Sequence, residues 1–512
     1  MNYYQTLKTL AVTIFMGCSI LSTQAQIYVD AAATTGANDG TSWANAYTDL
    51  QSALDAAAEN AEIRVAAGTY KPTEAPVTST DNRDKAFHFD IDLVLKGSYN
   101  PVTDAQDFTN RSILSGDFDG DDVITGSGST LSISGNSENA YHVLMTAGLT
   151  TAAQIEGFLI TGGGANGDGG TISYSGKNFY NDSGAGMYHI SSSPSIVNTI
   201  FSENSASFFS SGMYNSNSSS PSIVNTVFSR NSGTDGGGMY NGNFSSPSIV
   251  NTVFNGNKAG VGSGMYNSNS SSPNIVNTVF SGNEATSSSG GIHNNNNNSP
   301  TIYNSVFYGN GSDIVNSASA STTGGSNFSE HYAETGFTAL TADPFSDSAN
   351  PIGADGIWFT TDDGLQPSSA TSPITDEGDA TKLPLDTLDL DGGGDTTKAI
   401  PVDITGRTRI AGTALDAGAY EHDSAVLSVK DIDSSKLDIY STGYKTLVIH
   451  GVFNAKNTAN VYSLQGKLVA SKTFEKFSTS SSLDVSTLFT GIYIVKMHNA
   501  NHQVQTKKLF IQ

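Results

Sequence analysis

The chain has 512 residues, enough for two or three domains or for one long repeat domain with attachments. Only 14% of the residues are charged, yet acids outnumber bases 48 to 24 and the net charge is −24. This acidic balance excludes nucleic acid and anionic membrane surfaces as favoured partners. The 21 Tyr and 24 Phe residues exclude a disordered polymer.

The first 25 residues have the layout of a secretory signal peptide. Lys8 precedes an apolar stretch over residues 10–21, and small residues lead to a cleavage site after Ala25. A membrane anchor is the weaker alternative, because a spanning helix needs about 20 apolar residues. Lipidation of Cys18, the single cysteine, is a second alternative. Cleavage after Ala25 would leave a chain without a thiol, and no later stretch is typical of a transmembrane helix.

Residues 26–85 are expected to form an N-terminal cap and the first coils of a solenoid. Residues 27–30 have the composition of a strand, and residues 49–58 form one amphipathic helical pattern. The exposed end of a solenoid presents unpaired backbone groups and apolar side chains. We therefore expect the helix to cover that end, and residues 63–70 to begin the first coil.

Residues 86–342 contain a repeat that is regular from about residue 184 to residue 310. Five segments align at spacings of 26, 26, 26 and 27 residues, beginning at Gly186, Gly212, Gly238, Gly264 and Gly291. Each glycine precedes Met-Tyr or, in the last copy, Ile-His. A proline, a variant of Ser-Ile-Val-Asn-Thr-Val-Phe and an Asn three positions after the Phe follow. A fixed period of this length indicates a solenoid, a propeller or an array.

The content of the repeat selects a parallel β-helix of about 26 residues per coil, an all-β fold. Gly, Ser, Asn and Pro interrupt every stretch longer than about seven residues, which excludes a helical solenoid. A propeller blade needs about 40–50 residues. Coils stacked at the ordinary strand spacing of ~4.8 Å place equivalent residues above one another.

Stacking predicts three internal ladders of apolar side chains and one ladder of amides. The amide ladder is expected at a bend, and that bend must follow Asn198 if Ile196 and Phe201 are both to point inward. The predicted ladders are Met187, Met213, Met239 and Met265; Ile196, Ile223, Ile249 and Ile275; Phe201, Phe228, Phe254, Phe280 and Phe307; and Asn198, Asn225, Asn251, Asn277 and Asn304.

The combination of Gly-Gly-x-apolar with Phe-x-x-Asn resembles the repeats of chlamydial polymorphic outer-membrane proteins and of other secreted right-handed β-helix proteins. The resemblance covers about residues 158–310. It implies a right-handed parallel β-helix. It is specific for the fold and implies little about function, because that group includes adhesins and proteins of no known activity.

Residues 343–424 are acidic and no longer follow the repeat. Between residues 343 and 423 there are sixteen Asp or Glu against two Lys and two Arg. The segments Ser372–Ile374 and Asp416–Glu421 resemble the closing segment after such repeats in anchored bacterial surface proteins. We expect C-terminal coils and a cap here.

Residues 431–512 differ in charge from everything before them. They contain nine Lys and five Asp or Glu, whereas residues 26–430 carry a net charge of −29. Such a change of sign indicates a domain boundary. Short alternating segments and a hairpin turn at residues 464–467 predict a small antiparallel β-sandwich.

This tail resembles the type A sorting domain of type IX secretion substrates. The segments that carry the resemblance are Val461–Lys467, Leu483–Leu488, Gly491–Lys496 and Lys507–Phe510. Ser441-Thr442-Gly443 stands where the family usually has Pro-Asn-Pro. The resemblance implies export across the outer membrane, with the type IX translocon and its sortase as partners. The protein is then expected to be secreted or attached to the outer-membrane surface.

Two acidic clusters are candidates for weak calcium binding. Asp117, Asp119 and Asp121 alternate as in calcium loops, but the glycine and glutamate of an EF-hand are replaced by Asp122 and Gly128. The second cluster consists of Asp386, Asp389, Asp391 and Asp395. An acidic turn is the alternative in both places, and no other cofactor is indicated.

The sequence favours binding or surface structure over catalysis. If Tyr188, Tyr214, Tyr240 and Tyr266 point outward, they form a strip on which sugar rings could stack, as in an adhesin-like or glycan-contacting protein. If they point inward, they are core residues. A polysaccharide lyase or glycoside hydrolase acting on a lateral face is the second hypothesis. Under this second hypothesis the candidate catalytic residues are His142, Asp117, Asp119 and Asp182. Under the favoured hypothesis of binding, no residue is assigned a catalytic role.

Overall fold

The computed structural model describes residues 26–422, 438–442, 446–450, 457–464, 466–474, 480–499 and 504–511. The expected signal peptide and Cys18 lie outside the described residues. The chain forms two compact units, residues 1–424 and 425–512. Among the described residues, no helix is long and apolar enough to cross a membrane.

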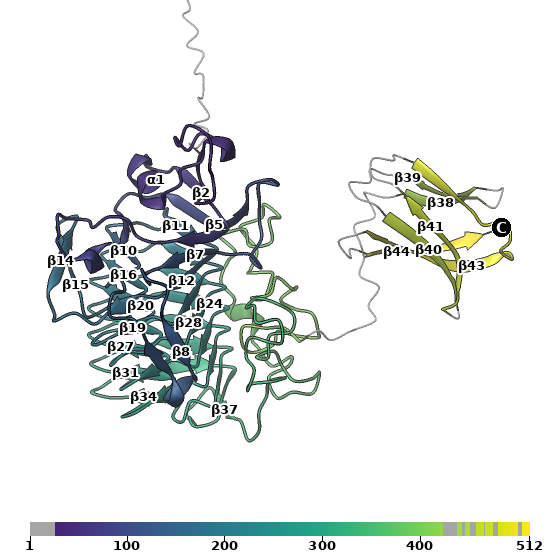
Figure 1. Cartoon of the computed structure of the whole chain (residues 1–512). Coiled ribbons are helices and arrows are strands. Elements are labelled where there is room, and N and C mark those ends of the chain that lie inside the picture. Colours follow the sequence, from purple (N-terminus) through teal and green to yellow (C-terminus); the bar gives the residue numbers. More distant parts are fainter. Residues whose placement is uncertain are drawn as a thin grey trace, which may run out of the picture. The chain divides into compact units, whose positions relative to one another are not determined.

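The first unit is a parallel β-helix built from three long sheets, which we name A, B and C (Figure 1). In the regular coils the chain runs through sheet C, then A, then B, and each strand pairs in parallel with its equivalent in the next coil. Sheet A contains β1 (Gln26–Val29), β2 (Glu62–Ala66), β5 (Val94–Asn100), β11 (Gln154–Glu156), β17 (Ser195–Val197), β21 (Ser222–Val224), β24 (Ser248–Val250), β28 (Asn274–Val276), β32 (Thr301–Tyr303) and β35 (Thr323–Gly325), with β6 (Ala105–Gln106) antiparallel to β5. Sheet B contains β3 (Gly68–Tyr70), β7 (Ser112–Ser115), β12 (Phe158–Thr161), β18 (Ile200–Ser202), β22 (Val227–Ser229), β25 (Val253–Asn255), β29 (Val279–Ser281), β33 (Val306–Tyr308), β36 (Asn327–Ser329) and β37 (Phe337–Ala339). Sheet C contains β4 (Phe87–Phe89), β10 (Leu144–Ala147), β16 (Met187–Ile190), β20 (Met213–Ser216), β23 (Met239–Asn241), β27 (Met265–Asn267), β31 (Ile292–Asn294) and β34 (Ile314–Asn316).

The three apolar ladders predicted from the repeat fill the interior. Every Met, Ile and Phe of the three series is fully buried in one continuous core. The five phenyl rings stack with centroid distances of 4.7–4.8 Å and interplanar angles of 1–6°. This distance equals the strand spacing, so each ring contacts the ring above and the ring below.

The predicted bend between sheets A and B lies at the asparagine series. Asn198, Asn225, Asn251, Asn277 and Asn304 all have φ between 48° and 52°, a left-handed conformation that asparagine tolerates better than most residues. Because of this bend, Ile196 and Phe201 both point inward. The amide ladder is only partly formed, since Asn225, Asn251 and Asn304 donate to the preceding amide at 3.2–3.3 Å, whereas Asn277 donates to the carbonyls of Asp416 and Gly418.

Two further asparagine ladders are buried inside the coils. The Asn of the Phe-x-x-Asn motif forms one of them, and the Asn that follows Met-Tyr forms the other. In both, each side-chain amide donates to the next at 2.8–3.0 Å. These amides satisfy one another where water is excluded, which is the condition for burying polar groups without a large penalty.

A short helix covers the first coil, as the sequence predicts. The helix is α1 (Leu50–Ala56), and Asp49 caps its N-terminus by accepting a hydrogen bond from Ser52 N at 2.8 Å. Leu50 and Leu54 are buried in the same core as the ladders. Single turns of 3-10 helix are η1 (Trp43–Asn45), η2 (Asn82–Asp84), η3 (Gly128–Thr130) and η4 (Ala380–Lys382).

Two hairpins and two short parallel pairs extend from the coils. The first hairpin and η3 form an arm, residues 117–136, that lies along the successive coils (Figure 1). Gly128 N donates to Gly256 O, and Lys258 Nζ donates to Leu131 O, both at 2.9 Å. The hairpins are β8 (Val123–Thr125) with β9 (Ser132–Ser134), and β14 (Thr171–Tyr174) with β15 (Lys177–Tyr180). The parallel pairs are β13 (Gly164–Ala165) with β19 (Ser205–Ala206), and β26 (Lys258–Ala259) with β30 (Glu284–Ala285).

The acidic segment, for which we expected further coils and a cap, packs along the side of the solenoid. Between residues 343 and 422, no described residue belongs to a strand of the three long sheets. Instead, the segment covers the outer face of sheet B, where Ile200 and four valines alternate with the inward-facing phenylalanines. The side chains that bury this stripe include Phe345, Trp358, Leu365, Ile374, Ile404 and Tyr420. The segment is therefore a lateral cover, and apolar burial is what attaches it.

The second unit is the antiparallel sandwich that the sequence predicts. Leu447, Val461 and Val495 come from its two sheets and share one apolar core. Ser463 N donates to Lys467 O at 2.9 Å, and Gly466 has a φ of 78°, so the expected hairpin turn is present. One sheet contains β38 (Asp438–Thr442), β39 (Thr446–His450) and β42 (Ser480–Asp484); the other contains β40 (Asn457–Ser463), β41 (Leu468–Phe474), β43 (Gly491–Asn499) and β44 (Val504–Ile511).

Candidate functional site

The four tyrosines expected as a strip for sugar stacking are buried. Tyr188, Tyr214, Tyr240 and Tyr266 are 1, 5, 5 and 8% exposed. They lie on the outer side of sheet C, opposite the methionines, but Ile172 and Phe179 of the β14–β15 hairpin, with Phe209 and Val261, pack over them. Their ring faces are used in contacts with one another. The strip is therefore a satellite core and offers no sugar platform.

The structure brings together only part of the first acidic cluster. Asp117 and Asp121 lie near Glu138, with one carboxylate oxygen of each within 4.8 Å of the others, whereas Asp119 is not part of this group. The sequence reasoning missed Glu138, which is distant in the chain. Burial raises the pKa of the neighbouring Asp122 to about 6. Asp117 also closes its own turn by accepting from Gly120 N at 2.5 Å.

The structure also brings together only part of the second acidic cluster. Asp386, Asp389 and Asp391 come together, and Asp395 does not join them. Both oxygens of Asp386 accept from Leu390 N at 3.0 Å, and Asp391 pairs with Lys398 at 2.7 Å. These contacts already satisfy much of the negative charge.

The four weak catalytic candidates do not form an acid–base group. His142 is fully buried, and its Nδ1 lies 3.0 Å from Gly184 O. Burial lowers the pKa of His142 to about 4, and no carboxylate opposes this shift. Asp182 accepts from Ser183 Oγ at 2.8 Å in the loop before β16. A neutral, enclosed imidazole of this kind is a core residue.

A cavity of about 810 Å³ opens on the outer side of sheet B; we name it the lateral groove. Its floor includes Ile113, Leu159 and Ile200, which belong to β7, β12 and β18. One wall is formed by residues 108–111 and the tip of the arm, and the other by residues 348–358 of the acidic segment. Trp358 belongs to this second wall, so the groove combines apolar surface with a few polar groups, as ligand pockets do.

Arg111 is the unusual polar residue of the lateral groove. Its guanidinium carbon lies 5.4 Å from the ring centre of Phe108 and 4.6 Å from that of Phe359. Nη1 donates to Asn198 O at 2.8 Å, but the buried Nε and Nη2 have no hydrogen-bond partner among the described residues. Burial lowers the pKa of Arg111 to about 9. An enclosed cation with two unused donors favours an oxygen-bearing anion as its partner.

The aromatic contact on Arg111 is held by a strained backbone. Phe359 has a φ of 75°, which is rare for a bulky side chain. Its N–H donates to Asp363 Oδ2 at 3.0 Å, and Tyr420 donates its hydroxyl to the same oxygen at 2.9 Å. Burial raises the pKa of Asp363 to about 7. The neighbouring Asp363 and Tyr420 thus fix the ring that faces Arg111.

An ion pair between successive coils adds two opposite charges to the lateral groove. Arg230 donates from Nη2 to Glu203 Oε1. Both residues occupy the position two after the stacked Phe in their coils. This pairing was not among the ladders predicted from the repeat. Their shared position in adjacent coils was the signal that could have found the pair.

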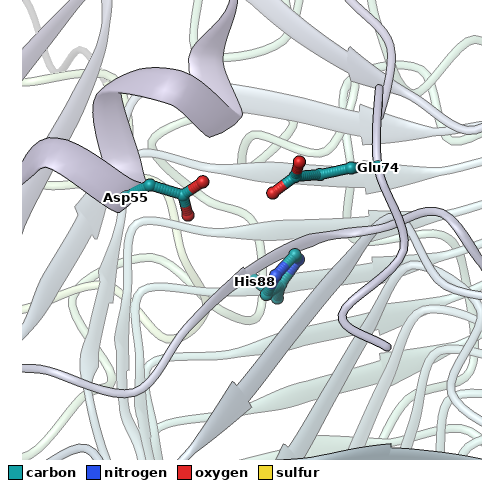
Figure 2. Close-up of side chains that lie close together, drawn as sticks. All are labelled: Asp55, Glu74 and His88. Atoms are coloured by element: carbon teal, nitrogen blue, oxygen red, sulfur yellow. The ribbon is translucent and has the colours of Figure 1, made fainter. Parts of the chain in front are cut away.

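A separate group lies at the N-terminal end of the β-helix, and the sequence reasoning missed it (Figure 2). Asp55 belongs to α1, Glu74 to the loop after β3, and His88 to β4. One oxygen of each acid and one ring nitrogen of His88 lie within 4.8 Å of one another. Partial burial, and then the hydrogen bond and charge of Asp55, raise the pKa of Glu74, while burial lowers the pKa of His88. These three side chains could hold a metal ion.

Comparisons with known proteins identify the tail and leave the body unassigned. Residues 442–512 match the family model described as the secretion system C-terminal sorting domain. This match confirms the type IX sorting tail, so the protein is exported and is secreted or attached to the cell surface. No curated protein matches the chain in sequence. A solved structure described as the crystal structure of pectate lyase Pel9A aligns over 78% of this chain and 97% of its own, with 14% identity and a TM-score of 0.39.

Proposed function

We propose that the exported β-helix binds an oligosaccharide bearing a carboxylate or sulfate group in the lateral groove. The observation that carries the proposal is Arg111, whose buried Nε and Nη2 have no protein partner in the described part of the chain. A carboxylate or sulfate oxygen would accept from both donors. It would also neutralise a cation that no described acid pairs with.

The remaining surface of the lateral groove suits a sugar ring. Ile352 and Leu159 supply apolar surface for the C–H face of a ring, while Asn110, Asn255 and the serines supply donors and acceptors for hydroxyl groups. The floor of the groove is a rigid sheet, and binding requires a local movement that uncovers the enclosed donors of Arg111. Binding of this kind would hold the exported protein on a cell-surface or extracellular polysaccharide, as an adhesin-like role requires.

Catalysis by a polysaccharide lyase or a glycoside hydrolase is the second function that the sequence left open, and the lateral groove supports it less. Glycoside hydrolysis generally uses two carboxyl groups placed on either side of the scissile bond. Among the residues that line the groove, Glu203 is the one carboxylate, and it is paired with Arg230. We therefore favour binding, and make turnover an outcome of the test.

The test measures binding of the full chain to a panel of neutral, uronate-containing and sulfated oligosaccharides. Arg111→Gln should weaken binding of the anionic glycans about 10–100-fold, because each charge-assisted hydrogen bond contributes roughly 1.5–3 kcal/mol. The matched control is Lys177→Gln. It removes one positive charge from the β14–β15 hairpin, which covers sheet C and does not line the groove.

Three results would overturn the proposal. The first is no binding to any acidic glycan. The second is a preference for neutral glycans that Arg111→Gln leaves intact. The third is the appearance of shortened or unsaturated sugar products, detected by mass spectrometry, which would replace binding by catalysis.

A further inference from the structure

We propose that Asp55, Glu74 and His88 form a site for one divalent transition-metal cation, with Zn²⁺ as the best fit, which fastens the N-terminal cap to the β-helix. This site is independent of the lateral groove, and nothing in the sorting tail bears on it. The three side chains come from α1, from the loop after β3 and from β4, so one ion would connect three segments.

The imidazole of His88 points to a ligand rather than to an acidic turn. The residue is 8% exposed. Its Nδ1 lies 2.9 Å from Ala86 O, which places the proton on Nδ1 and leaves the lone pair on Nε2. Among the described residues, no group hydrogen-bonds to Nε2. Figure 2 shows the ring below the carboxylate of Glu74, with Asp55 to one side. The imidazole is largely buried, and its free lone pair on Nε2 lies beside two acids that can share a cation with it.

The two carboxylates are not neutralised by the protein. Within residues 26–422, no Lys or Arg forms an ion pair with Asp55 or Glu74. The two acids face each other (Figure 2), which costs electrostatic energy unless a proton or a metal ion lies between them. A proton between the two acids would leave Nε2 of His88 unused, whereas a metal ion would bind Nε2 as well.

Gln51 supports the group from behind. Its Nε2 donates to Asp55 Oδ1 at 2.8 Å and to His88 O at 3.1 Å, and its Oε1 accepts from His88 N at 3.0 Å. The side chain is 1% exposed. Outer contacts of this kind orient metal ligands, and their loss typically weakens metal binding 10–100-fold.

The donor set selects the class of metal. One neutral imidazole with two carboxylates suits Zn²⁺ and related transition ions, whereas Ca²⁺ prefers six to eight oxygen ligands. Zn²⁺ binds nitrogen and oxygen at about 2.0–2.2 Å in a tetrahedral arrangement, so two of its ligands lie about 3.3–3.6 Å apart. The three ligand atoms lie within 4.8 Å of one another, so they must move together by up to about 1–1.5 Å to bind the ion. Asp55 and Glu74 are exposed and can rotate to supply this movement.

The experiment is isothermal titration of ZnCl₂ into the untagged, chelator-treated full chain, with hydrogen exchange measured in parallel. We expect one equivalent of tight binding and slower exchange of the amides in α1 and β4. Glu74→Gln and His88→Asn should each weaken the tight site at least tenfold. Gln51→Ala should weaken it by about tenfold.

Matched controls separate this site from other acids and imidazoles. Asp117→Asn alters another acidic cluster, and His331→Asn removes an imidazole that lies 3.7 Å from Glu330 near the last coil. Both should bind Zn²⁺ as the unaltered chain does. Absence of a stoichiometric site would overturn the proposal, and so would a tight site that survives Glu74→Gln and His88→Asn. Loss of binding in Asp117→Asn would instead place the metal in the arm.

Discussion

Replacing Asn257 by alanine should strongly destabilise the β-helix, although the side chain is small and polar. Asn257 is fully buried in the ladder formed by the Phe-x-x-Asn motif. Its Nδ2 donates to Phe228 O at 2.9 Å and to Asn283 Oδ1 at 2.8 Å. Its Oδ1 accepts from the backbone N and the side-chain Nδ2 of Asn231, both at 3.0 Å. Alanine removes all four bonds.

The magnitude follows from the groups that lose a partner. Two N–H groups of Asn231 are left without an acceptor in a place closed to water, and each such group costs about 1–3 kcal/mol. Asn283 Oδ1 keeps its bond from Asn257 N at 3.1 Å, so it adds little. We expect a loss of about 2–6 kcal/mol in the free energy of unfolding, and faster hydrogen exchange in β22, β25 and β29.

The assay is guanidinium denaturation of the full chain followed by tryptophan fluorescence. Both tryptophans, Trp43 and Trp358, belong to the first unit, so the signal does not report on the tail. The control is Asn243→Gly, in an exposed ladder whose bonds are 3.1 and 3.5 Å. Asn243 has a φ of 55°, which glycine adopts freely. The control should lose less than about 1 kcal/mol; equal losses in both variants would refute the reasoning.

Three further predictions concern the core, the cover and the tail. Phe254→Ala should cost about 3–5 kcal/mol in the same denaturation assay, because it opens a cavity between two stacked rings; a loss below about 1 kcal/mol would contradict the ladder. Asp363 has a pKa raised to about 7 by burial, so the folded protein holds a proton that the unfolded chain releases. Stability should therefore fall as the pH rises from about 4 to 7, and Asp363→Asn should flatten this dependence in thermal melts at pH 5 and pH 8; an unchanged slope would contradict it. Deleting residues 442–512 should prevent release or surface display, measured by immunoblotting of medium and envelope fractions, and normal export would contradict the sorting role.

The ladders could be predicted because the repeat is exact in length. Equivalent residues one period apart must stack when strands pair in register, so the positions of Met187, Ile196 and Phe201 in one coil determine those in the next. The bend at Asn198 followed from requiring two apolar side chains to face inward. The buried ladders after Met-Tyr and after Phe-x-x-Asn obey the same logic, but asparagine alone does not show whether it faces solvent or the interior.

The segments that bury the outer faces of sheets B and C were not predicted, although the sequence indicates that these faces are buried. In every regular coil an apolar residue precedes the inward Phe, as in Val253-Phe254, and in four of the five coils Tyr follows the inward Met. Neighbouring residues of a strand point to opposite faces, so both sides of sheets B and C had to be buried. Val253 is indeed fully buried by the acidic segment, and Tyr188 by the β14–β15 hairpin. What the sequence did not reveal was which segment would serve as each cover.

The lateral groove lies where the chain covers the outer face of sheet B incompletely. Its apolar floor, Leu159 and Ile200, continues the outer stripe of sheet B into the earlier coils. The acidic segment covers the stripe on one side, the arm crosses it on another, and Arg111 reaches the space between them from the loop before β7. These pieces are separated by up to about 250 residues, so no local motif could have indicated the site. A binding site on such a solenoid is found by asking which part of an apolar outer face its own chain leaves uncovered.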